Sequence, residues 1–109
     1  MMAKHFNGLT PAEAELLALL AEEMGEAIQC IGKILRHGYE SVDPTWTGPE
    51  DHRAPTNREN LEAELGDVMC TIELMGADLH FPAIVQQCAR KHKSVQRWLH
   101  HQQSVRTPA

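Results

Sequence analysis

Apolar residues recur at three- and four-residue steps in three segments of the chain, which is the period of an amphipathic helix. The first segment begins with Thr10-Pro11-Ala12-Glu13, a capping box with a proline at the first helical position. It runs to about Arg36, where His37-Gly38 signals the C-terminal end. Its predicted apolar stripe consists of Leu16, Leu17, Leu20, Met24, Ala27, Ile28, Ile31, Ile34 and Leu35.

The second segment starts near Thr56, where Glu59 completes another capping box. Pro82 predicts the start of a third helix. Residues 39–56 lack periodicity and contain several prolines, so they predict a long loop between the first two helices. The fold class is therefore all-α: one domain, residues 1–109, built as a small bundle of three main helices.

The composition of the chain argues against some classes of function. The chain has 109 residues and a net charge of -5, which argues against binding a nucleic-acid polymer. A three-helix core is small, so we expect homo-oligomerisation to complete it, as a homodimer or a dimer of dimers. No apolar run is long enough to span a membrane. Three cysteines without a CxxC motif predict reduced, buried thiols in a cytoplasmic protein.

Acidic residues repeat the same spacing in two places, "EEMGE" at 22–26 and "ELGD" at 64–67. If the first stripe is centred on Leu20, Glu23 lies roughly 60° and Glu26 roughly 120° to one side of it, whereas Glu22 points away. On the second helix, Glu64 and Asp67 likewise lie together on one side of its apolar stripe. Antiparallel packing of these helices would bring the four carboxylates together. Such an oxygen-rich cluster suits Mg²⁺ or Mn²⁺; the alternative is a solvated acidic surface.

Two lysines are candidates for contact with phosphate. Lys33 falls on the acidic flank of the first helix, and Lys91 lies about 20° from Ile84, inside the apolar stripe of the third helix. Trp46, in the loop, either anchors the loop against the core or stacks on a base.

The acidic motifs and their context carry a family resemblance. "EEMGE" followed by "ELGD", within "AEEMGEAIQCIGKILRHGYESVDP" and "TNRENLEAELGDVMCTIELM", resembles the EExxE and ExxD motifs of the MazG-like all-α nucleoside triphosphate pyrophosphohydrolases, in particular the short, stand-alone, phage-type members. The similarity covers roughly Leu17 to Trp98. The connection between the two motifs is longer than in compact members of that family.

This resemblance implies Mg²⁺-dependent hydrolysis of a (deoxy)nucleoside triphosphate to the monophosphate and pyrophosphate. It implies that Glu23, Glu26, Glu64 and Asp67 bind the metal, that Glu22 with Glu23 serves catalysis, and that Glu22 orients or activates the attacking water. Lys33 and Lys91 are then expected to bind phosphate, with Trp46 as a candidate base contact. Two alternatives stay open: a related enzyme acting on phosphoribosyl-ATP, and a non-catalytic helical interaction module.

Overall fold

The computed structural model describes residues 6–102 of the chain. This part holds three α-helices, α1 (Pro11–His37), α2 (Asn57–Leu74) and α3 (Phe81–Ser94), followed by a short 3-10 helix, η1 (Val95–Trp98). It holds no β-strand, only an isolated antiparallel bridge between Val42 and Thr56. The all-α prediction is confirmed. The chain divides into two compact units, one ending at Met75 and one beginning at Gly76, which are described separately below.

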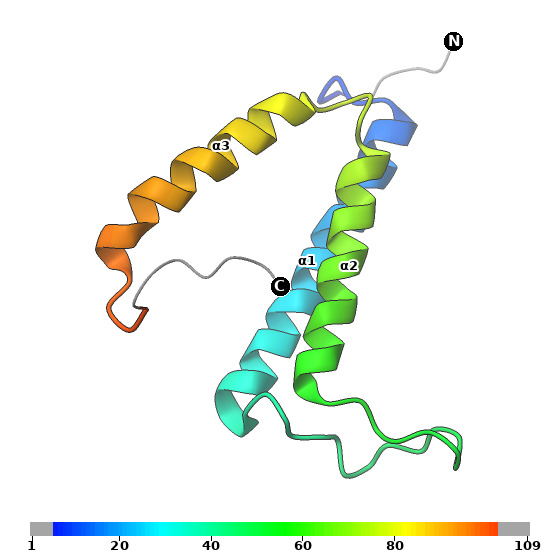
Figure 1. Ribbon diagram of the computed structural model, residues 1–109. Helices are drawn as coiled ribbons and strands as arrows, with labels where there is room; N and C mark the ends of the chain where they lie inside the picture. The colour runs from blue at the N-terminus through cyan, green and yellow to red at the C-terminus, as the bar shows by residue number, and fades with distance from the viewer. Residues whose placement is uncertain (1–5, 103–109) are drawn as a thin grey trace. The chain divides into compact units, whose positions relative to one another are not determined.

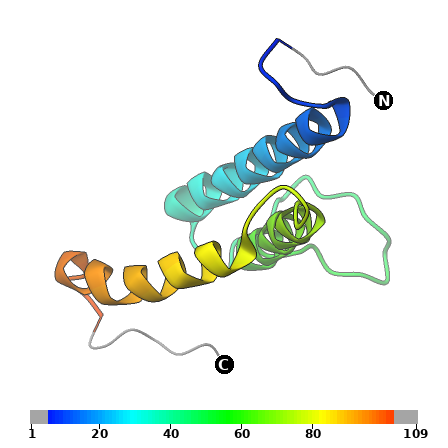
Figure 2. The ribbon, with the colours of Figure 1, turned by 90° about the horizontal axis from the view of Figure 1, so that it is seen from above.

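In the first unit, α1 and α2 lie side by side and run antiparallel (Figures 1 and 2). α1 begins with the predicted capping box: the Thr10 Oγ1 accepts a hydrogen bond from the Glu13 amide at 3.1 Å, and the Glu13 carboxylate accepts one from the Thr10 amide at 2.8 Å. The helix ends at Gly38, whose positive φ of 91° suits glycine. The local signals in the sequence therefore fixed both ends of α1.

The start of α2 has the same chemistry. Thr56 caps the helix and Glu59 returns the second bond of the capping box. Arg53 adds a two-pronged ion pair to the Glu59 carboxylate, with N–O distances of 2.6 and 2.8 Å. This pairing lowers the pKa of Glu59 to about 2, with a smaller contribution from the Thr56 amide. The first turn of α2 is thus fixed by a capped and charge-paired carboxylate.

The segment that joins α1 to α2 is closed at its base by backbone contacts. The amides of Asn57 and Arg58 donate to the carbonyls of Ser41 and Tyr39, each at 2.9 Å. The buried Asn57 side chain donates to the Gly38 carbonyl at 3.2 Å. These bonds join the C-terminal end of α1 to the N-terminal end of α2, so they help to fix the register of the two helices.

The contact between α1 and α2 covers part of the predicted apolar stripe of α1, where Leu16, Leu20 and Ile34 are half-buried. Of the apolar stripe, only Ala27 is buried, and α2 contributes the buried Thr71 beside the equally buried Met75. The rest of the stripe is uncovered because the contact of a helix with a single neighbour occupies a narrower face than the stripe itself. The uncovered residues of the stripe are Leu17, Met24, Ile28, Ile31 and Leu35.

The second unit consists of α3 and η1. α3 starts at Phe81, one residue before the predicted Pro82, which occupies the second helical position. Every residue of α3 is exposed. Across residues 6–102, no helix combines the length and apolar character needed to cross a membrane.

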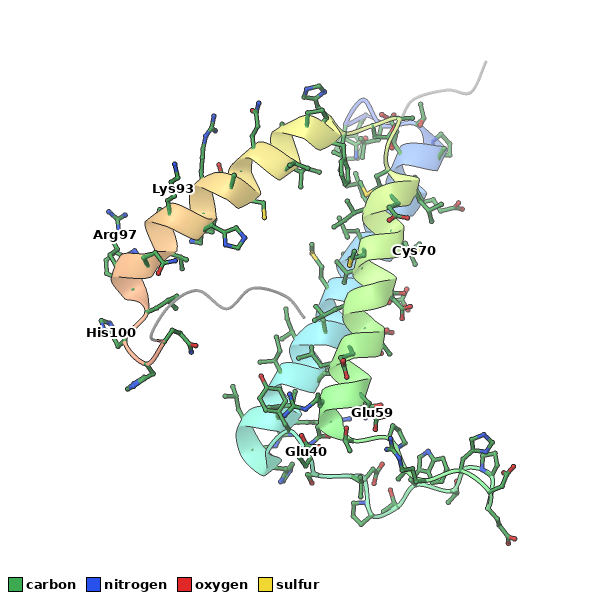
Figure 3. The ribbon with its side chains drawn as sticks, viewed as in Figure 1. Glu40, Glu59, Cys70, Lys93, Arg97 and His100 are labelled. Atoms are coloured by element: carbon green, nitrogen blue, oxygen red, sulfur yellow. The ribbon has the colours of Figure 1, made fainter. Side chains whose placement is uncertain are left out.

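All three thiols are free. Cys30 is half-buried, but Cys70 and Cys88 are exposed, so the prediction that the thiols are buried is wrong for these two. Cys70 projects from α2 in Figure 3. Cys70 is on a side of α2 that does not face α1. Cys88 belongs to α3, whose residues are all exposed.

Candidate metal centre

Four carboxylates converge between the two helices of the first unit. Glu23 and Glu26 come from α1, and Glu64 and Asp67 come from α2. One oxygen of each residue lies within 4.8 Å of the others. Because both pairs have i, i+3 spacing, each helix presents its two acids on one face. The antiparallel arrangement places those faces opposite each other, as the sequence predicted.

The burial of these four acids fits their predicted position on the flank of each apolar stripe. Glu23, Glu26 and Glu64 are half-buried, and only Asp67 is exposed. The Oε2 atoms of Glu23 and Glu64 have almost no accessible surface, and neither accepts a hydrogen bond. A covered carboxylate oxygen without a donor is costly. The arrangement therefore favours a positively charged ligand that can reach these oxygens.

Mutual repulsion shifts the protonation of two members of the cluster. Burial raises the pKa of Glu23, and the negative charges of Glu26, Asp67 and Glu22 raise it further. The pKa of Glu64 is raised first because its carboxyl lies within hydrogen-bonding reach of the Glu26 carboxyl, then by burial, and then by the negative charges of Glu26, Asp67 and Glu23. A bound cation would reverse both effects, since it favours the ionised carboxylate.

The chemistry of this donor set fits a hard divalent cation. All four ligands are carboxylates, and oxygen ligands of this kind are those preferred by Mg²⁺ and Mn²⁺. The described residues near the cluster provide no competing cation: no lysine or arginine within residues 6–102 forms an ion pair with any of the four acids. The cluster is therefore a candidate metal centre.

Two neighbours of the cluster, Thr71 and Cys30, add to its surroundings. The Thr71 hydroxyl donates to the Asp67 carbonyl at 2.9 Å and is itself buried, so it fixes the turn of α2 that carries Asp67. Cys30 lies one turn after Glu26, and its thiol pKa is raised by burial and by the charge of Glu64. Each of the two residues follows a cluster acid by four positions, so helical spacing puts it one turn from that acid.

The remaining predicted residues of the first unit lie around the cluster. Glu22 is exposed and lies outside the four-carboxylate group, although its charge reaches Glu23. Lys33 is exposed as well. Hydrogen bonds from Thr45 lower the pKa of Asp43, and the positive charge of Lys33 adds to this effect. The charge of Lys33, on α1, thus reaches the loop segment that follows the helix.

The loop holds the aromatic side chains in defined contacts. The Trp46 indole lies against Gly48, where an added Cβ would collide with the ring. Arg58 stacks on the Tyr39 ring, 4.2 Å from its centroid, and pairs with Glu40 at 2.8 Å. Figure 3 shows Glu40 and Glu59 at this end of the helix pair. Trp46 keeps part of its surface exposed, whereas Lys91 belongs to the second unit and is exposed on α3.

No protein-family model, curated protein or solved structure matches this chain.

Proposed function

We propose that the protein is a metal-dependent pyrophosphohydrolase that cleaves (deoxy)nucleoside triphosphates to the monophosphate and pyrophosphate, with a role in nucleotide-pool housecleaning. One observation supports this proposal above all. The two motifs that resemble the pyrophosphohydrolase signature supply the four carboxylates that converge between α1 and α2, and two oxygens of that cluster are covered and lack a donor.

In this proposal Glu23, Glu26, Glu64 and Asp67 hold Mg²⁺, with Mn²⁺ as a substitute. The bound cation would neutralise the triphosphate and lower the pKa of a coordinated water. Each carboxylate must be ionised to serve as a ligand, so the raised pKa values of Glu23 and Glu64 mean that binding releases protons.

Glu22 and Lys33 would act on the substrate from either side of this group. Glu22, exposed and next to Glu23 in sequence, accepts the proton of the attacking water. The water oxygen forms a bond to the α-phosphorus, the bond from that phosphorus to the bridging oxygen breaks, and pyrophosphate leaves with the bonding electrons. Lys33 then stabilises charge on the pyrophosphate. Trp46 offers a partly exposed ring for the base.

The proposed enzyme acts as a homo-oligomer, a homodimer or a dimer of dimers. Support comes from the uncovered part of the α1 stripe, where Ile28 is 67% and Leu35 82% exposed. A row of large apolar side chains at this exposure is typical of an interface rather than of a free surface. Because the three thiols are free, we place the enzyme in a reducing compartment, the cytoplasm.

The test is pyrophosphate release from a panel of nucleoside and deoxynucleoside triphosphates with Mg²⁺, Mn²⁺ or excess chelator. We expect release with either metal and none with chelator. Glu26→Ala and Asp67→Ala should each reduce the rate at least a hundredfold, whereas Glu62→Ala, an exposed α2 acid outside the cluster, should leave it unchanged. Failure of the wild-type protein on the whole panel, with phosphoribosyl-ATP included, would exclude the proposed activity.

A further inference from the structure

Beyond the four-carboxylate cluster, the seam between α1 and α2 continues toward the end where the 39–56 loop joins the two helices (Figure 1). Because the helices run antiparallel, residues that follow Glu26 on α1 lie opposite residues that precede Glu64 on α2. Two polar residues outside the cluster belong to these facing strips, Asn60 on α2 and Lys33 on α1.

Asn60 is on the side of α2 that carries the two carboxylates of the cluster. It lies roughly 40° from Glu64 and roughly 20° from Asp67 around the helix, and one turn, about 6 Å, before Glu64 along it. Asn60 is half-buried. Helical position and burial therefore place this residue in the seam between the helices, next to the cluster.

The Asn60 side chain has no structural partner, unlike two other uncharged polar side chains on this side of α2. Asn57 donates to the Gly38 carbonyl at 3.2 Å. Thr71 donates to the Asp67 carbonyl at 2.9 Å. No hydrogen bond within the described part of the chain reaches the Asn60 amide, which keeps accessible surface. Asparagine is also a poor residue for a helix interior, so the packing of the helix pair gives no reason for it at this position.

Lys33 extends the same line on α1. It lies roughly 20° from Glu26 around the helix and two turns, about 10 Å, beyond it. It is exposed and forms no ion pair within the described part of the chain. Burial and the charge of Glu64 raise the pKa of the Cys30 thiol, whereas the charge of Lys33 lowers it. The charge of Lys33 therefore reaches the seam close to the cluster.

A neutral donor beside the cluster and a cation beyond it suit an extended anion that is held by a metal ion. A cationic side chain in place of Asn60 would pair with the acids and compete with the metal for them. An amide N–H donates to an anionic oxygen without this competition, because it carries no net charge. Metal ion, amide and ammonium group in a row thus match the linked phosphates of a pyrophosphate group.

We propose that the Asn60 amide donates a hydrogen bond to a phosphate oxygen of the substrate's pyrophosphate group, between the metal at the cluster and Lys33. The inference rests on the proposed function for the position of the metal and of the leaving pyrophosphate. A charged acceptor makes this hydrogen bond stronger than one between neutral groups. Pyrophosphate keeps the same oxygens after hydrolysis, so inorganic pyrophosphate is a sufficient probe of the contact.

Isothermal titration calorimetry with inorganic pyrophosphate and saturating Mg²⁺ tests the contact without catalysis. Loss of one hydrogen bond to a charged group should weaken binding about ten- to a hundredfold in Asn60→Ala. Asn60→Asp keeps the size of the side chain but replaces the donor by a negative charge, so it should weaken binding at least as much. Glu62→Ala, an exposed residue on the opposite side of α2, is the control and should bind as the wild-type protein does.

Two further measurements separate this contact from a structural role and from metal coordination. Alanine is the better helix former, so Asn60→Ala should unfold in urea at a midpoint no lower than that of the wild-type protein. Mg²⁺ alone should raise the Tm of both proteins equally. A lower urea midpoint or a lost Mg²⁺ effect would overturn the proposal, since Asn60 would then support the fold or ligate the metal. Wild-type pyrophosphate affinity in either Asn60 variant, or no binding by the wild-type protein, would overturn it equally.

Inhibition of hydrolysis distinguishes this inference from the proposed function. In an active enzyme, inhibition by added pyrophosphate should weaken in Asn60→Ala by the factor found in calorimetry, and inhibition by the monophosphate product should stay unchanged. Equal weakening of both, or of neither, would refute the contact and leave the proposed function intact. A wild-type protein that hydrolyses no substrate but binds pyrophosphate through Asn60 would contradict the proposed function and support the contact.

Discussion

Magnesium should stabilise the folded helix pair, and this effect follows from where the four acids lie. The cluster exists only when α1 and α2 are packed, because each helix supplies two of the carboxylates. A ligand that binds the folded state alone adds about 2.7 kcal/mol of stability at a concentration one hundred times its Kd. In a domain of this size, each kcal/mol raises Tm by about 4–8 °C, so we expect a shift of roughly 10–20 °C.

Glu64→Gln separates the two contributions of the cluster. The variant loses one ligand and one of the charges that repel Glu23 and Glu26. Without metal it should therefore melt at a higher temperature than the wild-type protein, and magnesium should raise its Tm by a much smaller amount. Glu62→Gln, with the same change on an exposed part of α2, should keep the wild-type shift.

The rise in Tm caused by magnesium should depend on pH, and the direction of that dependence follows from two pKa values. Glu23 and Glu64 have raised pKa values in the folded protein, so the metal-free folded state binds more protons than the unfolded state and loses stability as pH rises through those values. Magnesium binds the ionised cluster, so its stabilising effect should grow over the same rise in pH.

Thermal unfolding followed by circular dichroism, with chelator and with saturating Mg²⁺, measures all of these quantities. A wild-type Tm that does not respond to Mg²⁺ or Mn²⁺ would refute the metal centre. If Mg²⁺ raised the Tm of Glu64→Gln by as much as that of the wild-type protein, the cation would bind elsewhere.

Three further predictions concern the N-terminal end of α2 and the loop before it. Thr56→Ala removes the N-cap and should cost about 1 kcal/mol in urea unfolding; an unchanged unfolding midpoint would contradict the capping geometry. The pKa of Glu59 is lowered to about 2, so its pairing with Arg53 should stabilise the fold above pH 4.5 and be lost progressively as pH falls toward 2, and Arg53→Ala should weaken this acid dependence. Gly48→Ala introduces a Cβ that collides with the Trp46 indole, so the tryptophan emission maximum should shift to longer wavelength, and an unchanged spectrum would refute that contact.

The sequence was most informative where the determinants are local. Capping boxes at Thr10 and Thr56 act within one turn of helix, and both were correctly predicted. The convergence of the four acids was also predictable, because the i, i+3 spacing on two antiparallel helices leaves few other arrangements. Local chemistry thus specified the helices and brought the candidate site together.

Other features depend on what covers a surface, and the sequence does not contain that information. The apolar stripe of α1 predicted a core, yet Ile28 and Leu35 are largely exposed because one neighbouring helix covers only part of so broad a face. Pattern alone identifies an apolar face without identifying its partner.

Hydrolysis of a nucleoside triphosphate at the four-carboxylate cluster is the central claim made for this protein. The decisive measurement is product analysis after incubation of the wild-type protein with a panel of deoxynucleoside triphosphates and Mg²⁺, with Asp67→Ala in parallel. We predict equimolar monophosphate and pyrophosphate from at least one substrate, and neither product from the variant or with chelator. Diphosphate and inorganic phosphate as products, or equal turnover by Asp67→Ala, would contradict it.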